Sequence, residues 1–156
     1  MTEPRWLSED EQRSWRAFLS VNLLLFDQLG REMQRQHGLT NADYEILVNL
    51  SEAPDRRLRM SELAGRTLSS RSRLSHQVAR MEAAGLVERT PCAQDRRGFW
   101  ANLTETGWKT LVEAAPDHVA GVRAHLVDAM TPEQFSQLGQ ACQVVADRLR
   151  TLNRAE

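Results

Sequence analysis

Apolar side chains recur at three- and four-residue intervals in the N-terminal part of the chain. The series is Leu19, Leu23, Phe26, Leu29 and Met33. This spacing places one apolar stripe along a helix, which we predict over 9–37. Ser8 and Glu11 form a capping-box pattern at its start, and Gly38 marks its end. A helix of this length in a small chain cannot bury its stripe alone, so we expect it to face a partner surface.

A second group of elements follows. The pattern predicts a helix from Thr40 to just before Pro54, a brief strand within 55–60, a short helix over 61–67 and a longer helix over 70–84. Leu74, Val78 and Met81 form the apolar face of the last helix, and its opposite face is polar and basic. Two short helices, a tight connection and a basic second helix are typical of a helix-turn-helix.

After Gly85 the period of the pattern changes from 3.6 to 2, which predicts a β-hairpin. Its parts are a strand over 86–90, a charged turn over 91–98 and a return strand over 99–103. Thr104 then caps a helix that we expect to be broken or kinked near Pro116, and residues 131–133 start a final helix. The predicted fold is therefore mainly α with a small β-hairpin wing, a winged helix-turn-helix flanked by helices at both ends.

The length of 156 residues suits one compact protomer. The longest apolar stretch, residues 21–26, is too short to cross a membrane, so we expect no membrane partner. The polar, acidic first residues resemble neither a secretory signal nor a transit peptide, and we expect a cytoplasmic location. Two cysteines are too few for a disulfide framework or a four-thiolate zinc site.

Charge is distributed unevenly, although the formal net charge is only -1. Residues 56–97 contain ten arginines against four carboxylates. A basic segment in an otherwise acidic chain indicates a face for a polyanion, and the alternative is a salt-bridged helical surface. The bias toward arginine favours the first interpretation slightly, because guanidinium groups bind phosphate and guanine edges in bidentate fashion.

The candidate DNA-binding residues lie on the second helix of the motif and at the hairpin tip. They are Ser70, Arg71, Ser72, Arg73, Ser75, His76, Arg80, Arg96 and Arg97. The N-terminal half of such a helix reaches base edges in the major groove, whereas a hairpin arginine enters the minor groove. The alternatives are a solvated helix face and an ordinary charged turn. We expect Asp95 to hold an arginine or the turn rather than face phosphate.

Four segments together resemble the MarR family of winged helix-turn-helix transcriptional regulators. They are LTNADYEILVNL (39–50), MSELAGRTLSSRSRLSHQVARMEAAGLVERTP (60–91), DRRG (95–98) and LTETG (103–107). The segments cover about half of the chain and occur in the order and spacing of the family. One departure is that His76 and Gln77 stand where many members have a basic and an apolar residue.

The resemblance implies a homodimer that binds double-stranded DNA. Residues 9–37 and 105–152 would be mainly dimerisation helices, and 40–104 would form the DNA-binding lobe. It also implies a small-molecule pocket between the dimerisation helices and that lobe. We therefore expect a repressor that a small aromatic or phenolic effector releases from an inverted-repeat operator. The alternative is a constitutive or architectural DNA-binding protein without an effector.

Aromatic residues are the candidates for lining the effector pocket, because aromatic walls suit flat organic acids and phenols. They are Trp15, Phe18, Tyr44, Trp100 and Trp108, with Arg16 as a counter-charge. The alternative, which we favour for any single residue, is that each belongs to the core.

Other chemistry finds little support in the sequence. The HExxH, CxxC, GxSxG and glycine-rich phosphate motifs are absent, so we predict no enzyme, no catalytic residues and no cofactor. His118 and His125 are too far apart to ligate one ion unaided, and we predict no metal site. Cys92 beside the wing is a weak candidate for a redox switch, and Cys142 lies on an apolar stripe and is expected in a core.

Overall fold

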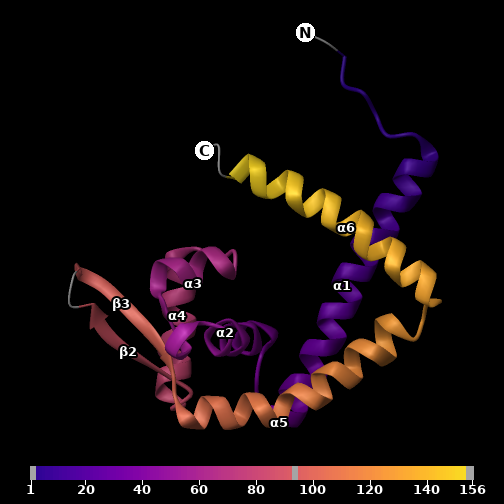
Figure 1. The fold of residues 1–156 in the computed structure, drawn as a ribbon. Coiled ribbons are helices and arrows are strands. Elements are labelled where there is room, and N and C mark those ends of the chain that lie inside the picture. Colours follow the sequence, from indigo (N-terminus) through magenta and orange to yellow (C-terminus); the bar gives the residue numbers. More distant parts are fainter. Residues whose placement is uncertain (1–2, 93–94, 154–156) are drawn as a thin grey trace. The chain divides into compact units, whose positions relative to one another are not determined.

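The computed structural model describes residues 3–92 and 95–153. The chain forms two compact units, the first ending at His118 and the second starting at Val119. Helices dominate the described residues, and three strands form a small sheet, so the predicted fold class is confirmed (Figure 1). No helix in residues 3–92 and 95–153 is long and apolar enough to cross a membrane.

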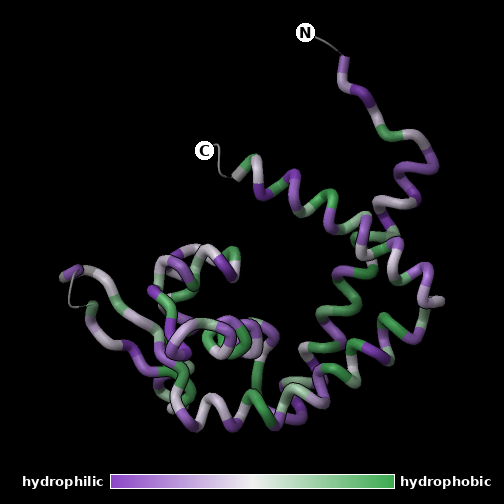
Figure 2. Tube along the Cα trace, in the orientation of Figure 1, coloured by the Kyte–Doolittle hydropathy of each residue, from purple (hydrophilic) through white to green (hydrophobic). Residues whose placement is uncertain are grey.

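Helix α1 spans Glu9–His37, as the spacing of apolar residues predicts. The Ser8 hydroxyl accepts the backbone N–H of Glu11, and the Glu11 carboxylate accepts that of Ser8 at 2.7 Å. The hydrogen bond from the Ser8 backbone N–H, followed by the Ser8 side chain, lowers the pKa of the Glu11 carboxylate. Apolar residues recur on successive turns of α1 (Figure 2), yet only Leu29 and Met33 are buried. Most of the stripe is therefore uncovered in a single chain.

The helix-turn-helix follows with the predicted elements in the predicted order. They are α2 (Asn41–Ser51), a 3-10 turn (Pro54–Arg56), β1 (Arg57–Arg59), α3 (Met60–Arg66) and α4 (Arg71–Ala83). The Ser70 hydroxyl caps α4 by accepting the backbone N–H of Arg73 at 3.2 Å. The core joins these helices to the sheet, and its largest fully buried side chains are Ile46, Leu47, Leu50, Leu63, Leu74, Val78, Met81 and Val87.

The wing consists of β2 (Val87–Cys92) and β3 (Asp95–Leu103), with β1 on the other side of β3, all antiparallel. The predicted turn over 91–98 is wrong, because strand structure continues through Pro91 and resumes at Asp95. Proline lacks a backbone donor and was expected to end the strand. It is tolerated here because β2 is an edge strand of the sheet.

Helix α5 spans Glu105–Val122 and continues through Pro116, so of the predicted break or kink near this proline the break is not found. A proline removes only one helical hydrogen bond, and Pro116 is exposed, so water can reach the carbonyl one turn earlier. A π-helical turn follows at Arg123–Val127, and α6 spans Pro132–Asn153 with Pro132 in its first turn. None of residues 132–152 is buried within the chain.

Candidate nucleic-acid interface

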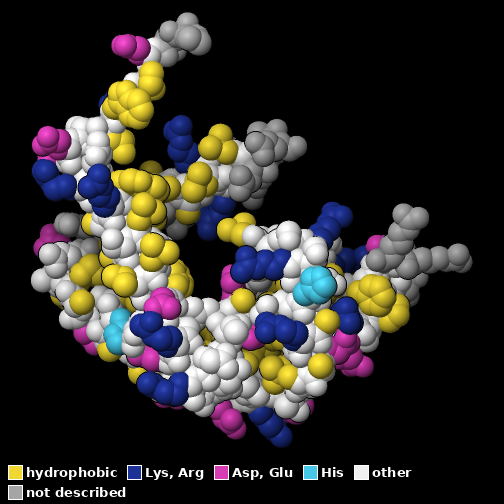
Figure 3. All heavy atoms as spheres, turned by 180° about the vertical axis from the view of Figure 1, so that it is seen from behind, with side chains coloured by type: hydrophobic (Ala, Val, Ile, Leu, Met, Phe, Trp, Pro, Cys, Tyr) yellow, Lys and Arg dark blue, Asp and Glu magenta, His cyan; other side chains and the backbone are white. Residues whose placement is uncertain are grey.

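The N-terminal half of α4 presents a polar and basic surface to solvent. Leu74, Val78 and Met81 turn one face of the helix into the core. The opposite face carries the residues predicted to contact DNA, and all of them are exposed: Ser70, Arg71, Ser72, Arg73, Ser75, His76 and Arg80. The space-filling view shows several Lys and Arg side chains, in dark blue, on the surface of the lobe that contains the helix-turn-helix (Figure 3). The helix therefore has the surface that a recognition helix needs.

Two of the α4 side chains also contact α2. Gln77 donates to the carboxylate of Asp43 at 2.6 Å, and Arg80 lies 3.6 Å from the same carboxylate. The unusual glutamine at 77 thus has a polar partner in a part-buried position. Arg80 is 62% exposed beside this ion pair, so its predicted contact with DNA stays a prediction.

An ion pair fastens the wing to α4. Glu82 on α4 accepts hydrogen bonds from the Arg89 side chain at 2.9 and 2.6 Å, and from the Arg89 backbone N–H at 2.9 Å. These hydrogen bonds lower the pKa of Glu82. The pair fixes β2 relative to the recognition helix and so holds the wing beside it.

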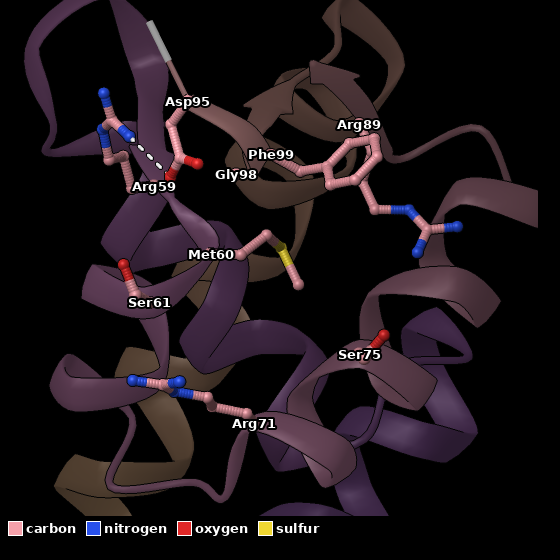
Figure 4. Close-up of a pocket in the computed structure, with 9 residues that line it drawn as sticks. All are labelled: Arg59, Met60, Ser61, Arg71, Ser75, Arg89, Asp95, Gly98 and Phe99. Carbon is pink, nitrogen blue, oxygen red and sulfur yellow. Dashed lines mark ion pairs between the residues drawn. The ribbon is translucent and has the colours of Figure 1, made fainter. Parts of the chain in front are cut away.

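A cleft of about 510 Å³ separates the wing from the start of α3 and α4 (Figure 4). Its lining residues are Arg59, Met60, Ser61, Arg71, Ser75, Arg89, Asp95, Gly98 and Phe99. Three guanidinium groups and two hydroxyls in one open cleft suit a sugar-phosphate strand. Sequence reasoning did not identify Arg59, Ser61 and Arg89, which come from β1, α3 and β2.

The structure gives local contacts for two residues of the DRRG segment (95–98), Asp95 and Gly98. Asp95 forms an ion pair with Arg59 at 3.6 Å, so its predicted role of holding an arginine is confirmed. A Cβ atom at Gly98 would lie 2.6 Å from the Asp95 carboxylate, so a larger residue there would require the Asp95 side chain to move. The side chains of Arg96 and Arg97 lie outside the described part of the structure, so their minor-groove role stays a prediction.

Proteins of known structure are similar to this chain in both fold and sequence. The structure of AbsC, a MarR family transcriptional regulator from Streptomyces coelicolor, is 51% identical, covers 95% of this chain and 99% of its own, and has a TM-score of 0.88. The chain belongs to the MarR family. It is a DNA-binding transcriptional regulator, and the family is not one of enzymes, as predicted.

Two further relatives and the family profile agree with this assignment. The MarR family profile matches residues 37–98. Sco3205 from Streptomyces coelicolor, a MarR family regulator solved in complex with DNA, is 46% identical over 96% of this chain and 93% of its own, with a TM-score of 0.90. The transcriptional regulator HosA of Escherichia coli is 29% identical over 79% of this chain and 91% of its own length.

The structure does not bring the predicted effector residues of this MarR protein together. Trp15 and Phe18 stack on each other at 5.9 Å on an exposed part of α1, beside the exposed Arg16. Trp100 and Trp108 are covered by arginines instead. Arg57 and Arg59 lie 5.0 and 5.1 Å from the Trp100 ring, and Arg56 lies 4.0 Å from the Trp108 ring.

Tyr44 is the one predicted effector residue that lines a pocket between α1, α2 and α5. The pocket has a volume of about 410 Å³, and its lining residues are Phe26, Leu29, Asn41, Tyr44, Glu45, Val48 and His118. The Tyr44 and His118 rings lie 4.4 Å apart. Burial raises the pKa values of Tyr44 and Glu45 and lowers that of His118, so each of the three favours its neutral form more than it would in water.

The structure offers neither a metal site nor an accessible thiol at Cys92 among the described residues. No group of three or more His, Cys, Asp or Glu side chains in residues 3–92 and 95–153 could hold a metal ion. Cys92 is buried, which disfavours oxidation. Cys142 is exposed in the single chain, so the expectation that it lies in a core is wrong for the protomer.

Proposed function

We propose that the protein is a homodimeric repressor that binds an inverted-repeat operator, with α4 in the major groove and the wing in the adjacent minor groove. The observation that carries the proposal is the exposed basic face of α4, which continues into the arginine-lined cleft at the base of the wing. The similarity to Sco3205, solved with DNA, supports it. Recognition then divides into base contacts from α4 and phosphate contacts from the cleft.

The dimer is supported by apolar surface that the single chain leaves exposed. Large apolar side chains are exposed on α1 and on α6; they are Phe18, Leu19, Leu23, Leu24 and Phe26 on α1, and Phe135, Leu138, Val145 and Leu149 on α6. Exposed apolar surface of this extent marks a protein interface. Sedimentation at micromolar concentration should give about twice the protomer mass of 17.8 kDa.

Changing Arg73→Ala should relax base preference at one symmetric position of the operator. The expected cost is about 1 to 3 kcal/mol, the value of a bidentate guanine contact. Arg97→Ala, at the wing, should instead weaken binding to all sequences alike. The measurement is selection of genomic fragments by the purified protein, followed by binding curves on the recovered sites. Half-sites should lie roughly 10 to 10.5 base pairs apart.

Two results would contradict this scheme. Selected fragments without two-fold symmetry would exclude binding of a dimer through paired recognition helices. Selected sites that bind both variants as tightly as the parent protein would show that α4 and the wing do not contact DNA.

The effector is proposed to bind in the pocket lined by Tyr44, Glu45 and His118. Its volume is within the range of small-molecule sites, and its walls combine apolar side chains with a few polar groups. No Arg or Lys lines it, and Arg16, the counter-charge expected from the sequence, lies elsewhere. An ionised Glu45 would repel a carboxylate, whereas a neutral phenol can donate its hydroxyl to Glu45. The lining therefore favours a phenol over an aromatic acid.

A neutral phenol should weaken operator binding by about 5- to 150-fold, the usual range of allosteric coupling. The test compares 4-methylphenol with 4-methylbenzoate by DNA binding and by tryptophan fluorescence. Trp15→Phe identifies the reporting tryptophan, and Glu45→Gln should reduce the preference for the phenol. If a broad panel of phenols and aromatic acids changes neither signal, constitutive DNA binding is the better description.

A further inference from the structure

We propose that Asp43 is a positioning residue that sets the rotation of the recognition helix, and through it the base preference of the protein. The inference rests on the docking of α4 in the major groove proposed above. Asp43 lies on α2 and is only 8% exposed. It is the one buried side chain among the polar and charged residues of the described chain. A buried carboxylate is retained only where its oxygens are satisfied, so its partners indicate its role.

Each oxygen of the Asp43 carboxylate binds a different element. Oδ2 accepts the Thr40 backbone N–H at 2.9 Å and the Thr40 hydroxyl at 2.6 Å, which fixes the side chain at the start of α2. Oδ1 accepts Nε2 of Gln77 at 2.6 Å and lies 3.6 Å from Nη2 of Arg80. One rigid carboxylate therefore joins the cap of α2 to the middle of α4.

The spacing of Gln77 and Arg80 along α4 explains why their contacts with Asp43 resist rotation of the helix. Gln77 and Arg80 are three residues apart, about one turn, so they lie on the same face of the helix. Two attachments one turn apart, both to a single oxygen, resist rotation of α4 about its axis. The Gln77 bond should dominate, because Arg80 is 62% exposed and its ion pair is longer.

Rotation of α4 matters because base contacts tolerate little displacement. Side-chain tips lie roughly 5 to 6 Å from a helix axis, so a turn of roughly 20° moves a tip by roughly 2 Å. A hydrogen bond is lost over a much smaller displacement. Arg73 and His76, on the exposed face near Gln77, would then miss the base edges that they are proposed to read. Phosphate contacts of long arginines outside α4 would survive.

The experiment measures the ratio of affinities for the selected operator and for an unrelated duplex of equal length, at one salt concentration. Asp43→Ala and Gln77→Met each remove the hydrogen bond between residues 43 and 77, and Asp43→Ala leaves Gln77 only its longer bond to the Thr40 hydroxyl at 3.4 Å. Each variant should lower this ratio about tenfold, the scale of one lost base contact. In Asp43→Asn the carbonyl oxygen can still accept from the Thr40 backbone N–H, and the amide N–H can donate to Oε1 of Gln77 once that side-chain amide turns over, so the ratio should stay within about threefold of the parent. Asn49→Ala is the matched control, because among the described residues Asn49 donates within α2 alone, to the Glu45 carbonyl.

Melting temperatures measured in parallel separate positioning from stability. If Asp43 only stabilises the fold, Asp43→Ala lowers the melting temperature and leaves the affinity ratio unchanged, which overturns the proposal. An equally low ratio in Asp43→Asn or in Asn49→Ala also overturns it. Arg73→Ala serves as the reference for docking. An unchanged ratio in Arg73→Ala as well would show that α4 does not read bases, and would overturn the docking scheme itself.

Discussion

Gly107→Ala should destabilise the DNA-binding lobe by about 3 kcal/mol or more, at the upper end of the cost of overpacking. An added Cβ at this position would lie 2.1 Å from the Leu86 carbonyl oxygen and 2.8 Å from the Leu103 side chain. The backbone cannot retreat easily. The Gly107 N–H donates to the Thr104 hydroxyl at 2.9 Å, and the Thr104 N–H donates to the Leu86 carbonyl at 3.2 Å.

Urea unfolding followed by circular dichroism gives the free energy of unfolding for this variant. Gly65→Ala is the matched control, because Gly65 is also helical but has nothing within 4 Å of its added Cβ. Alanine there should raise stability by up to about 1 kcal/mol, the helix preference of alanine over glycine. A Gly107→Ala protein as stable as the Gly65→Ala protein would contradict the close approach of α5 to Leu86.

Helix boundaries could be predicted from the sequence because their determinants are local. Ser8, Thr40 and Ser70 each cap a helix by accepting a backbone N–H three residues later. The partners lie within one turn, so the sequence displays the whole interaction. The two prolines behaved differently from prediction for a tertiary reason. Pro91 is tolerated on an edge strand and Pro116 at an exposed position of α5, and neither location can be read from the local sequence.

The arrangement of the site depends on contacts between distant segments. Gln77 and Asp43 are 34 residues apart, and no periodicity links them. Trp108 packs against the core, which is one of the two interpretations that the sequence left open. Arginines of the segment 56–59 lie over the rings of both Trp100 and Trp108. Cation–π contacts of this kind keep an aromatic ring near the surface. The sequence shows the arginines and the tryptophans, and only the folded sheet and α5 show that they pair.

The face of α4 was predicted but the cleft was not, because only the face follows from a local pattern. A helix face follows from a 3.6-residue period, whereas the cleft combines single residues from β1, α3, α4 and the wing. Arg89 is an example: it lines the cleft, but its guanidinium is held by Glu82. Its charge is therefore largely compensated within the protein, which leaves Arg59 and Arg71 as the stronger candidates for phosphate.

The double variant Arg59→Ala, Arg71→Ala should bind DNA of any sequence about a hundredfold more weakly, because each change removes a charge-assisted contact to phosphate. Arg71 has no hydrogen-bond or ion-pair partner among the described residues, and Arg59 has only a long contact of 3.6 Å to Asp95 in addition to Trp100. Both guanidiniums can therefore turn to a phosphate at little cost.

The decisive measurement is the dependence of affinity on salt, because each phosphate contact contributes about 0.9 to the slope of log affinity against log salt. Each protomer of the dimer loses one contact, so the slope should fall by about 1.8 for Arg71→Ala and by about twice that for the double variant, equally on operator and unrelated DNA. Arg66→Ala is the matched control, since Arg66 is on α3 but pairs with Glu62 and lies outside the cleft. A double variant with the slope of the parent protein would place the DNA backbone elsewhere, and the cleft would then have no part in binding.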